Sequence, residues 1–235
     1  MGAVPATTAL DFRVPVKLPR LDDAPGTTLE LVVVAADGQY CAGVDLASGA
    51  LVRTWSPAPS SDTPRPYDTP RPYDTPPPYD TVAVTLDAAI DRVPDPTQPE
   101  ALALTGPPVP TGRLTGRRAE RLLRPLLHPE DQPLLGTRAS AERFWARRPD
   151  HPSIALVAPG GPVLAVRDGP YLACRFTWRG TALELPCLDR RLAAAMDRAG
   201  RTRVGCGHGQ RIVVALHPPI DGHCHKVVET VLRNP

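Results

Sequence analysis

The sequence predicts a mainly β protein with short helices, built as two small β-barrels joined by a basic helical linker. Short apolar runs bounded by Gly, Pro or Asp are typical of strands and turns, and they occur in both halves of the 235-residue chain. A stretch near the middle instead carries leucines among arginines, which favours helices. A chain of this length can form one large or two small domains.

Residues 1–28 are expected to form an N-terminal arm, because the prolines in PVKLPRL exclude a central strand. Residues 29–110 are expected to form the first domain. It opens with a β-meander of three runs, LELVVVA, YCAGVDL and ALVRTWS, separated by turns at Gly38 and Gly49. The alternating run VAVTL (82–86) predicts a further strand, and 101–104 is a short apolar run.

A proline-rich repeat interrupts this first domain at 57–80. The hexapeptide DTPRPY occurs at 62–67 and 68–73, and DTPPPY follows at 74–79. Closely spaced prolines prevent a helix and remove sheet hydrogen bonds, so an extended, polyproline-like loop insertion is expected. The alternative is a functional one, in which the repeat is a ligand for an aromatic groove on a partner protein.

Residues 111–150 are expected to form the basic helical linker. One helix is predicted over 115–127, with Pro125 bending or ending it, and a second is predicted to begin at Ser140. The leucines of the first helix would pack on a sheet. Its arginines, Arg117, Arg118 and Arg121 among them, would face either water or a phosphate backbone.

Residues 151–235 are expected to form the second domain. The runs SIALVA, PVLAVR, YLACRFTW, ALELPCL, RIVVAL and CHKVVETVL predict strands, and 188–199 predicts one helix that Gly200 ends. A helix before the last two strands, and a long excursion inside each half, indicate barrels of the OB type.

The charge is unevenly distributed along the chain. Residues 1–100 hold 14 acidic and 7 basic side chains, whereas residues 101–235 hold 11 acidic and 20 basic ones. This asymmetry favours a polyanionic partner for the second half, or contact between the halves. No secretory signal or membrane-spanning run is recognisable, and the five scattered cysteines suit free thiols in a reducing compartment, so a cytoplasmic location is expected.

Three stretches resemble a known bacterial family. They are CAGVDLASGALVRTWSP (41–57), the segment 79–102 with its Gln98-Pro99-Glu100 signature, and the closing segment 212–232, in which Gly222, Cys224, Lys226 and Val227 carry the pattern. In order and spacing these stretches are similar to proteins with the dual OB-containing domain. Ala101 and His225 depart from the family's pattern. The resemblance implies two OB-like units and a nucleic-acid-binding role, and it implies no catalytic residue.

Candidate binding residues are cations and aromatics on strands, together with polar residues in turns. A cation beside an aromatic side chain on a sheet face suits a planar anionic ligand such as a nucleotide. The predicted nucleic-acid-binding residues are Arg53, Trp55, Gln98, Glu100, Arg117, Arg118, Arg121, Arg175, Trp178, Arg179 and Lys226. The alternative interpretation places Trp55 in the core and Arg53 on the surface, with the Glu100 carboxylate bonded to backbone amides.

The sequence therefore predicts a non-catalytic protein that binds DNA or RNA and needs no cofactor. One alternative is a protein-interaction adaptor that uses the proline-rich loop. Another is a zinc- or Cys-dependent enzyme built from Cys206, His208, His217 and the His223-Cys224-His225 tripeptide. Strand alternation argues against the zinc site, because it points Cys224 away from its two flanking histidines.

Overall fold

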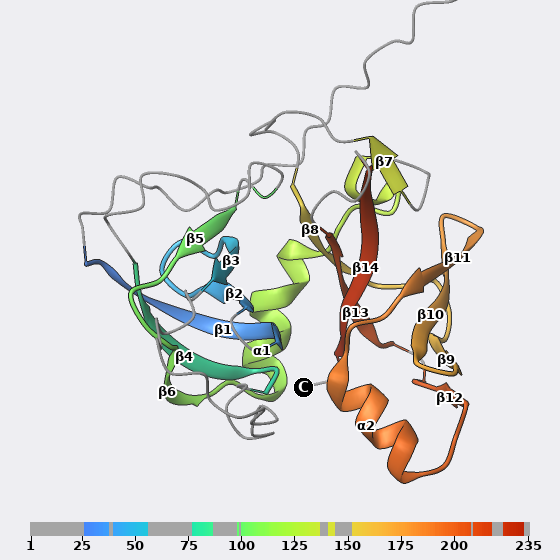
Figure 1. Cartoon of the computed structure of the whole chain (residues 1–235). Coiled ribbons are helices and arrows are strands. Elements are labelled where there is room, and N and C mark those ends of the chain that lie inside the picture. The colour runs from blue at the N-terminus through green and yellow to red at the C-terminus, as the bar shows by residue number, and fades with distance from the viewer. Residues whose placement is uncertain are drawn as a thin grey trace, which may run out of the picture.

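The structure is a computed structural model that describes residues 26–37, 40–55, 77–86, 98, 100–136, 141–143, 152–207, 209–217 and 223–232. Strands dominate these residues, and α1 (Gly116–Leu123) and α2 (Arg190–Arg198) are the two α-helices among them. Figure 1 shows two β units side by side, with α1 between them. Neither helix of the described part is long and apolar enough to cross a membrane.

The first unit is a six-stranded sheet. Its strands are β1 (Thr28–Asp37), β2 (Tyr40–Asp45), β3 (Leu51–Trp55), β4 (Asp80–Thr85), β5 (Ala101–Ala103) and β6 (Val109–Arg113). They lie in the order β5-β3-β2-β1-β4-β6, and only the β3–β5 pair is parallel. The predicted meander is confirmed, with Gly49 at positive φ in the turn before β3.

The second unit has two four-stranded sheets, in the orders β11-β10-β9-β12 and β7-β14-β13-β8. The strands are β7 (Ala141–Arg143), β8 (Ile154–Val157), β9 (Leu164–Asp168), β10 (Tyr171–Trp178), β11 (Thr181–Pro186), β12 (Arg203–Gly205), β13 (Arg211–Leu216) and β14 (His223–Leu232). The predicted helix near 188–199 is confirmed as α2, whose first turn is capped by the Asp189 carboxylate.

In the linker, the structure agrees with the prediction for the first helix but not for the second. α1 is followed by a 3-10 turn η1 (Arg124–Leu126) that contains Pro125, as the sequence predicts. A second 3-10 turn is η2 (Leu134–Gly136). The helix predicted to begin at Ser140 is wrong where the structure describes this region. Residues 141–143 form the strand β7 instead, because pairing with the end of β14 supplies their backbone hydrogen bonds.

The predicted fold class is therefore confirmed at the level of a mainly β protein with two short helices. The strands of the described residues form three open sheets, and none of these sheets closes on itself as the predicted barrels would. A cluster of buried apolar residues joins the two units: Val34, Ala42, Val44, Ala119, Leu123, Leu156, Val213 and Leu232 belong to it. Burying these side chains together holds the units and α1 against one another.

The last four residues of the expected proline-rich insertion, 77–80, are among the described residues. Tyr79 is buried in the cluster that joins the units, and Asp80 is the first residue of β4. The backbone N–H of Tyr79 donates to the carbonyl of Val33, which fixes the start of β4 beside β1. Residues 57–76, which include the other two hexapeptide copies, lie outside the described residues.

Candidate nucleic-acid interface and the buried arginine seam

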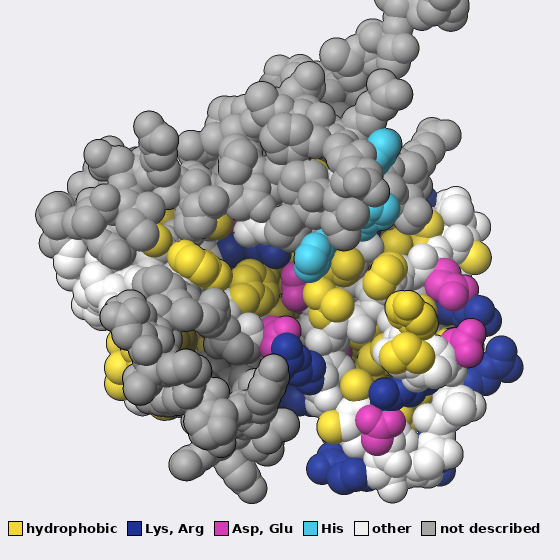
Figure 2. Space-filling view, viewed as in Figure 1, with side chains coloured by type: hydrophobic (Ala, Val, Ile, Leu, Met, Phe, Trp, Pro, Cys, Tyr) yellow, Lys and Arg dark blue, Asp and Glu magenta, His cyan; other side chains and the backbone are white. Residues whose placement is uncertain are grey.

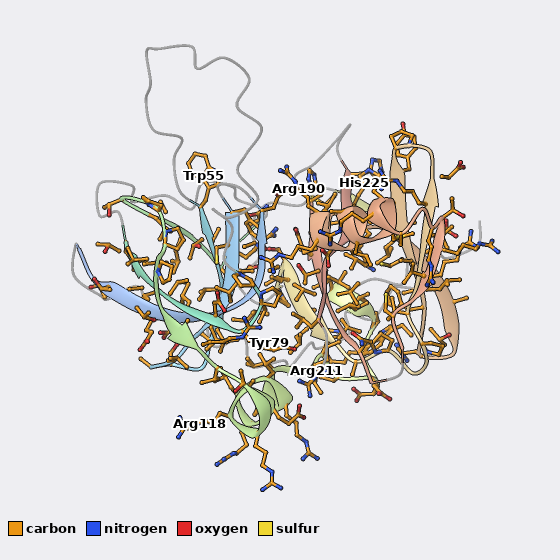
Figure 3. The ribbon with its side chains drawn as sticks, turned by 90° about the horizontal axis from the view of Figure 1, so that it is seen from below. Trp55, Tyr79, Arg118, Arg190, Arg211 and His225 are labelled. Atoms are coloured by element: carbon orange, nitrogen blue, oxygen red, sulfur yellow. The ribbon has the colours of Figure 1, made fainter. Side chains whose placement is uncertain are left out.

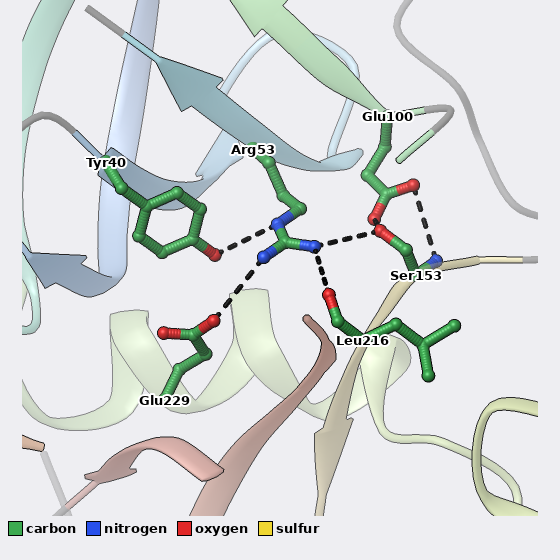
Figure 4. A network of polar contacts seen from close by, with 6 residues as sticks. All are labelled: Tyr40, Arg53, Glu100, Ser153, Leu216 and Glu229. Carbon is green, nitrogen blue, oxygen red and sulfur yellow. Dashed lines mark hydrogen bonds and ion pairs between the residues drawn. The ribbon is translucent and has the colours of Figure 1, made fainter. Parts of the chain in front are cut away.

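Arg53 lies in β3 within an apolar strand, and its side chain is only 4% exposed. It points into the contact between the two units rather than to solvent (Figure 4). Its Nε donates to the hydroxyl of Tyr40 at 3.2 Å, which keeps both side chains on one side of the β2–β3 pair. The guanidinium carbon also lies 5.0 Å from the centroid of the Tyr40 ring, which is cation–π distance.

The same guanidinium reaches three groups of the second unit. Its Nη1 donates to Ser153 Oγ at 3.0 Å and to the carbonyl oxygen of Leu216 at 3.2 Å. Its Nη2 pairs with Glu229 Oε1 at 3.4 Å. We call Tyr40, Arg53, Glu100, Ser153 and Glu229, with the Leu216 carbonyl, the arginine seam.

A β-bulge places Glu229 in the seam. Val213 pairs with Thr230 and Val214 pairs with Val228, so Glu229 is the extra residue of β14. A bulge redirects a side chain relative to its neighbours. On the other side of the seam Ser153 connects Arg53 to Glu100, because the Ser153 hydroxyl donates to Glu100 Oε1 and the Ser153 N–H donates to Oε2.

Burial governs the charges in the seam. It raises the pKa values of Glu100 and Glu229, and the positive charge of Arg53 opposes both shifts. Burial also acts to lower the pKa of Arg53, but Tyr40, Glu100 and Glu229 outweigh it, so the pKa is raised and Arg53 stays charged. The seam is thus a buried, hydrogen-bonded ion pair that holds two units together.

Both interpretations of Arg53 are wrong, and so is the alternative that places Trp55 in the core. Arg53 was expected to face a ligand, or to lie on the surface, and it is buried in the seam. Trp55, at the end of the same strand, is 40% exposed rather than part of the core. Glu100 is also buried and bonds to Ser153, so it does not present its carboxylate to a base edge. Gln98 is half-buried, and its carbonyl accepts from the N–H of Ala101.

The arginines of α1 lie where the sequence predicts. Arg117, Arg118 and Arg121 are exposed, and so is Arg124 at the start of η1, an arginine of the predicted basic linker that is not among the named candidates. Spacings of four and three residues put Arg117, Arg121 and Arg124 on one helical stripe. The opposite stripe, with Ala119 and Leu123, is buried against the two units. Figure 3 shows Arg118 pointing away from both units.

No described carboxylate pairs with the four exposed arginines of α1 and η1, which we call the basic face. Six other arginines do have such partners, whereas Arg179, Arg198, Arg201 and Arg203 are exposed and likewise pair with no described carboxylate. The ion pairs are Arg53 with Glu229, Arg113 with Asp80, Arg167 with Asp197, Arg175 with Glu184, Arg190 with Asp37, and Arg211 with Glu120. The basic face is therefore an exposed positive surface that the described acidic residues leave uncompensated.

The predicted residues of the second unit do not join this surface. Arg175 pairs with Glu184 at 2.6 Å, and Arg179 is exposed at the β10–β11 turn. Trp178, expected to stack on bases, is buried beside His128 and donates from Nε1 to the Gln132 carbonyl. Lys226 is 2% exposed rather than facing a groove. Figure 2 shows acidic side chains among basic ones over this unit.

The predicted binding residues therefore do not form a single cationic surface. Arg53 and Lys226 are buried, Arg175 is paired, and Trp55 and Arg118 lie on opposite sides of the molecule (Figure 3). Only the α1 part of the predicted set forms a continuous exposed surface. The spacing of Arg124 from Arg121 was the signal that could have added it to the set.

The thiols and histidines give no metal site within the described residues. All five cysteines are thiols, and Cys41, Cys174, Cys187 and Cys224 are buried. In β14 Cys224 is buried while His223 is exposed, as strand alternation predicts. Burial raises the pKa of the Cys41 thiol to about 12, which keeps it protonated and unreactive near neutral pH.

No family model and no curated protein matches this chain. The resemblance to proteins with the dual OB-containing domain therefore stays a prediction.

Proposed function

We propose that the protein binds nucleic acid, DNA or RNA, without catalysing a reaction, and that the basic face of α1 and η1 contacts the phosphate backbone. The observation that carries this proposal is the set of four exposed arginines with no described carboxylate partner. Arginine donates in a planar fork that fits phosphate oxygens, so exposed arginines in one row suit a row of phosphates.

The position of these arginines in the helix supports a role outside folding. Arg117 and Arg118 lie in the first turn of α1, and that turn has no acidic residue. The helix dipole favours negative side chains there, and a cation opposes it by about 0.3–1 kcal/mol. Helix stability therefore does not account for two arginines at this end, whereas attraction of a polyanion does.

The finer fold proposal is that each unit is a partly open barrel of the OB type. In the first unit the isolated bridge between Leu86 and Leu104 connects the end of β4 to the end of β5, which are distant in the sheet order. In the second unit the parallel bridge between Cys187 and Val228 connects the residue after β11 to β14. Both bridges support a Greek-key ring of strands, and α2 falls between β11 and β12 of the second unit.

Binding can be tested by fluorescence anisotropy with labelled 20-nucleotide probes at 50 mM salt. The test variant is R117A/R121A/R124A, which removes the stripe of the basic face. The matched control is R198A/R201A/R203A, which removes three exposed arginines between the end of α2 and the start of β12 and so lowers the net charge equally. We expect the test variant to bind at least about tenfold more weakly than the control variant. Equal losses in the two variants, or no binding by the unmodified protein, would contradict the proposal.

A further inference from the structure

We infer that the basic face prefers double-stranded to single-stranded nucleic acid and contacts the phosphate backbone without stacking on bases. This inference rests on the proposed function and names the form of nucleic acid that the same surface takes. OB-type units would instead suggest binding to single strands. The duplex preference follows from the positions of the aromatic side chains.

Single-strand binding relies on aromatic side chains beside the cationic groove, because each base stacks on a ring. The residues of α1 and η1 include no aromatic. Of the described aromatics, Tyr79, Phe176 and Trp178 are buried and Tyr40 is held in the seam. Trp55 is exposed, but it lies on the opposite side of the molecule from Arg118 (Figure 3).

The remaining exposed aromatic of the described residues is Tyr171. Its side chain is 78% exposed. Tyr171 lies at the β9–β10 turn of the second unit, where it pairs with Asp168 of β9. Tyr171 is therefore part of the β11-β10-β9-β12 sheet and not of α1. On that sheet basic side chains lie among acidic ones, as in the Arg175–Glu184 pair. The basic face thus offers guanidinium groups and no stacking platform among the described residues.

A surface that contacts phosphates alone gains most from the higher charge density. Duplex DNA carries one negative charge per about 1.7 Å of axis, and the counterions released per contact are about 0.9 for a duplex against about 0.7 for a single strand. At about 1.5 Å of rise per residue, the stripe from Arg117 to Arg124 is about 10 Å long. That length covers about three phosphates of one strand, and Arg118 lies beside the stripe, so we expect three to four phosphate contacts.

The test measures anisotropy of the full chain with a 20-base-pair duplex and with one of its strands, from 50 to 200 mM salt. We expect tighter binding of the duplex, with an affinity that falls about 100-fold over this range. In R117A/R121A/R124A the fall should shrink to about threefold. In R117K/R121K/R124K the charge is kept, so most of the salt dependence should remain, and this variant controls for a folding defect.

The outcomes separate this inference from the proposed function. Tighter binding of the single strand, weakened by Trp55→Ala or Tyr171→Ala, would overturn the duplex preference and leave nucleic-acid binding intact. No binding of either probe at 50 mM salt would overturn both. Duplex binding that survives R117A/R121A/R124A but is lost in R198A/R201A/R203A would also overturn both, because the site would then lie on α2.

Discussion

The arginine seam and the basic face both depend on arginine, but the arginines have different roles in the two regions. Arg53 is buried, and its guanidinium is shared between Tyr40, Ser153, the Leu216 carbonyl and Glu229. The arginines of α1 are exposed and pair with no described carboxylate. A buried guanidinium whose donors are used internally stabilises the fold, whereas an exposed and uncompensated row is available to a partner. The location of an arginine, and not its presence, decides between these roles.

The largest expected effect comes from breaking the seam. Arg53→Met leaves Glu229 as a buried carboxyl group without its cation, and removes the donor to the Leu216 carbonyl. Loss of one partner of a buried ion pair typically costs about 3–5 kcal/mol of unfolding free energy, which urea denaturation would measure.

The matched control for the seam variant is Arg175→Met. Arg175 also pairs with a glutamate, but both of these side chains are about half exposed. Exposed pairs contribute less than about 1 kcal/mol. If the two variants lost similar amounts of unfolding free energy, the seam would not have the structural role assigned to it.

Substitutions in the basic face should weaken binding and leave stability nearly unchanged. R117A/R121A/R124A should weaken duplex binding at least about tenfold, because three phosphate contacts are lost. Its unfolding free energy should change by less than about 1 kcal/mol, since these side chains are exposed and Arg117 opposes the helix dipole. A large loss of stability would mean that this face is structural too.

A smaller effect is expected from His128, which lies between the linker and the second unit. Burial lowers the pKa of His128, and Lys226 lowers it further, while its bond to the Pro133 carbonyl acts the other way. The unfolded chain then binds this proton more readily, so stability is highest above the unfolded-state pKa and falls as pH drops from 7 to 5.

Denaturant unfolding at pH 7, 6 and 5 would measure this dependence. One such group contributes at most about 1.4 kcal/mol per pH unit. His128→Gln keeps a donor for the Pro133 carbonyl and removes the titration, so its stability should vary less with pH than that of the unmodified protein. An unchanged pH dependence would show that other groups cause the fall.

The smallest effect should follow removal of residues 62–73, which are two whole copies of the hexapeptide. This deletion spares Tyr79, whose ring is part of the cluster that joins the units. Loop-closure entropy changes slowly with loop length, so the unfolding free energy should change by less than about 1 kcal/mol. Duplex binding should be unchanged. Loss of a protein partner in pull-down after this deletion would instead favour the adaptor alternative.

The local sequence pattern predicts the helices and strands of this protein better than it predicts which distant segments pack against them. The meander, α1 with Pro125 and α2 with Gly200 follow from turn chemistry and helical spacing, which are properties of neighbouring residues. The strand at 141–143 does not, because its hydrogen bonds come from β14, about 80 residues later.

The seam was not predictable for the same reason. Ser153 and Glu229 meet Arg53 from 100 and 176 residues away, and a bulge in β14 is needed to aim Glu229. The alternation of residues in β3 does not indicate that the second unit packs over the face of the strand that carries Arg53. A charged residue inside an apolar strand, as in LVRTW and VVETVL, was the available signal that both side chains are buried and paired.

The contrast between the two sets of arginines can be tested in one labelling experiment. Arginines of the unmodified protein would be reacted with phenylglyoxal, with and without a 20-base-pair duplex, and quantified by mass spectrometry. We predict that Arg117, Arg118, Arg121 and Arg124 react rapidly and are protected by the duplex. Arg53 should stay unreacted in both samples, and Arg198, Arg201 and Arg203 should react in both. Rapid reaction of Arg53, or protection of the α2 arginines in place of those on α1, would contradict the account.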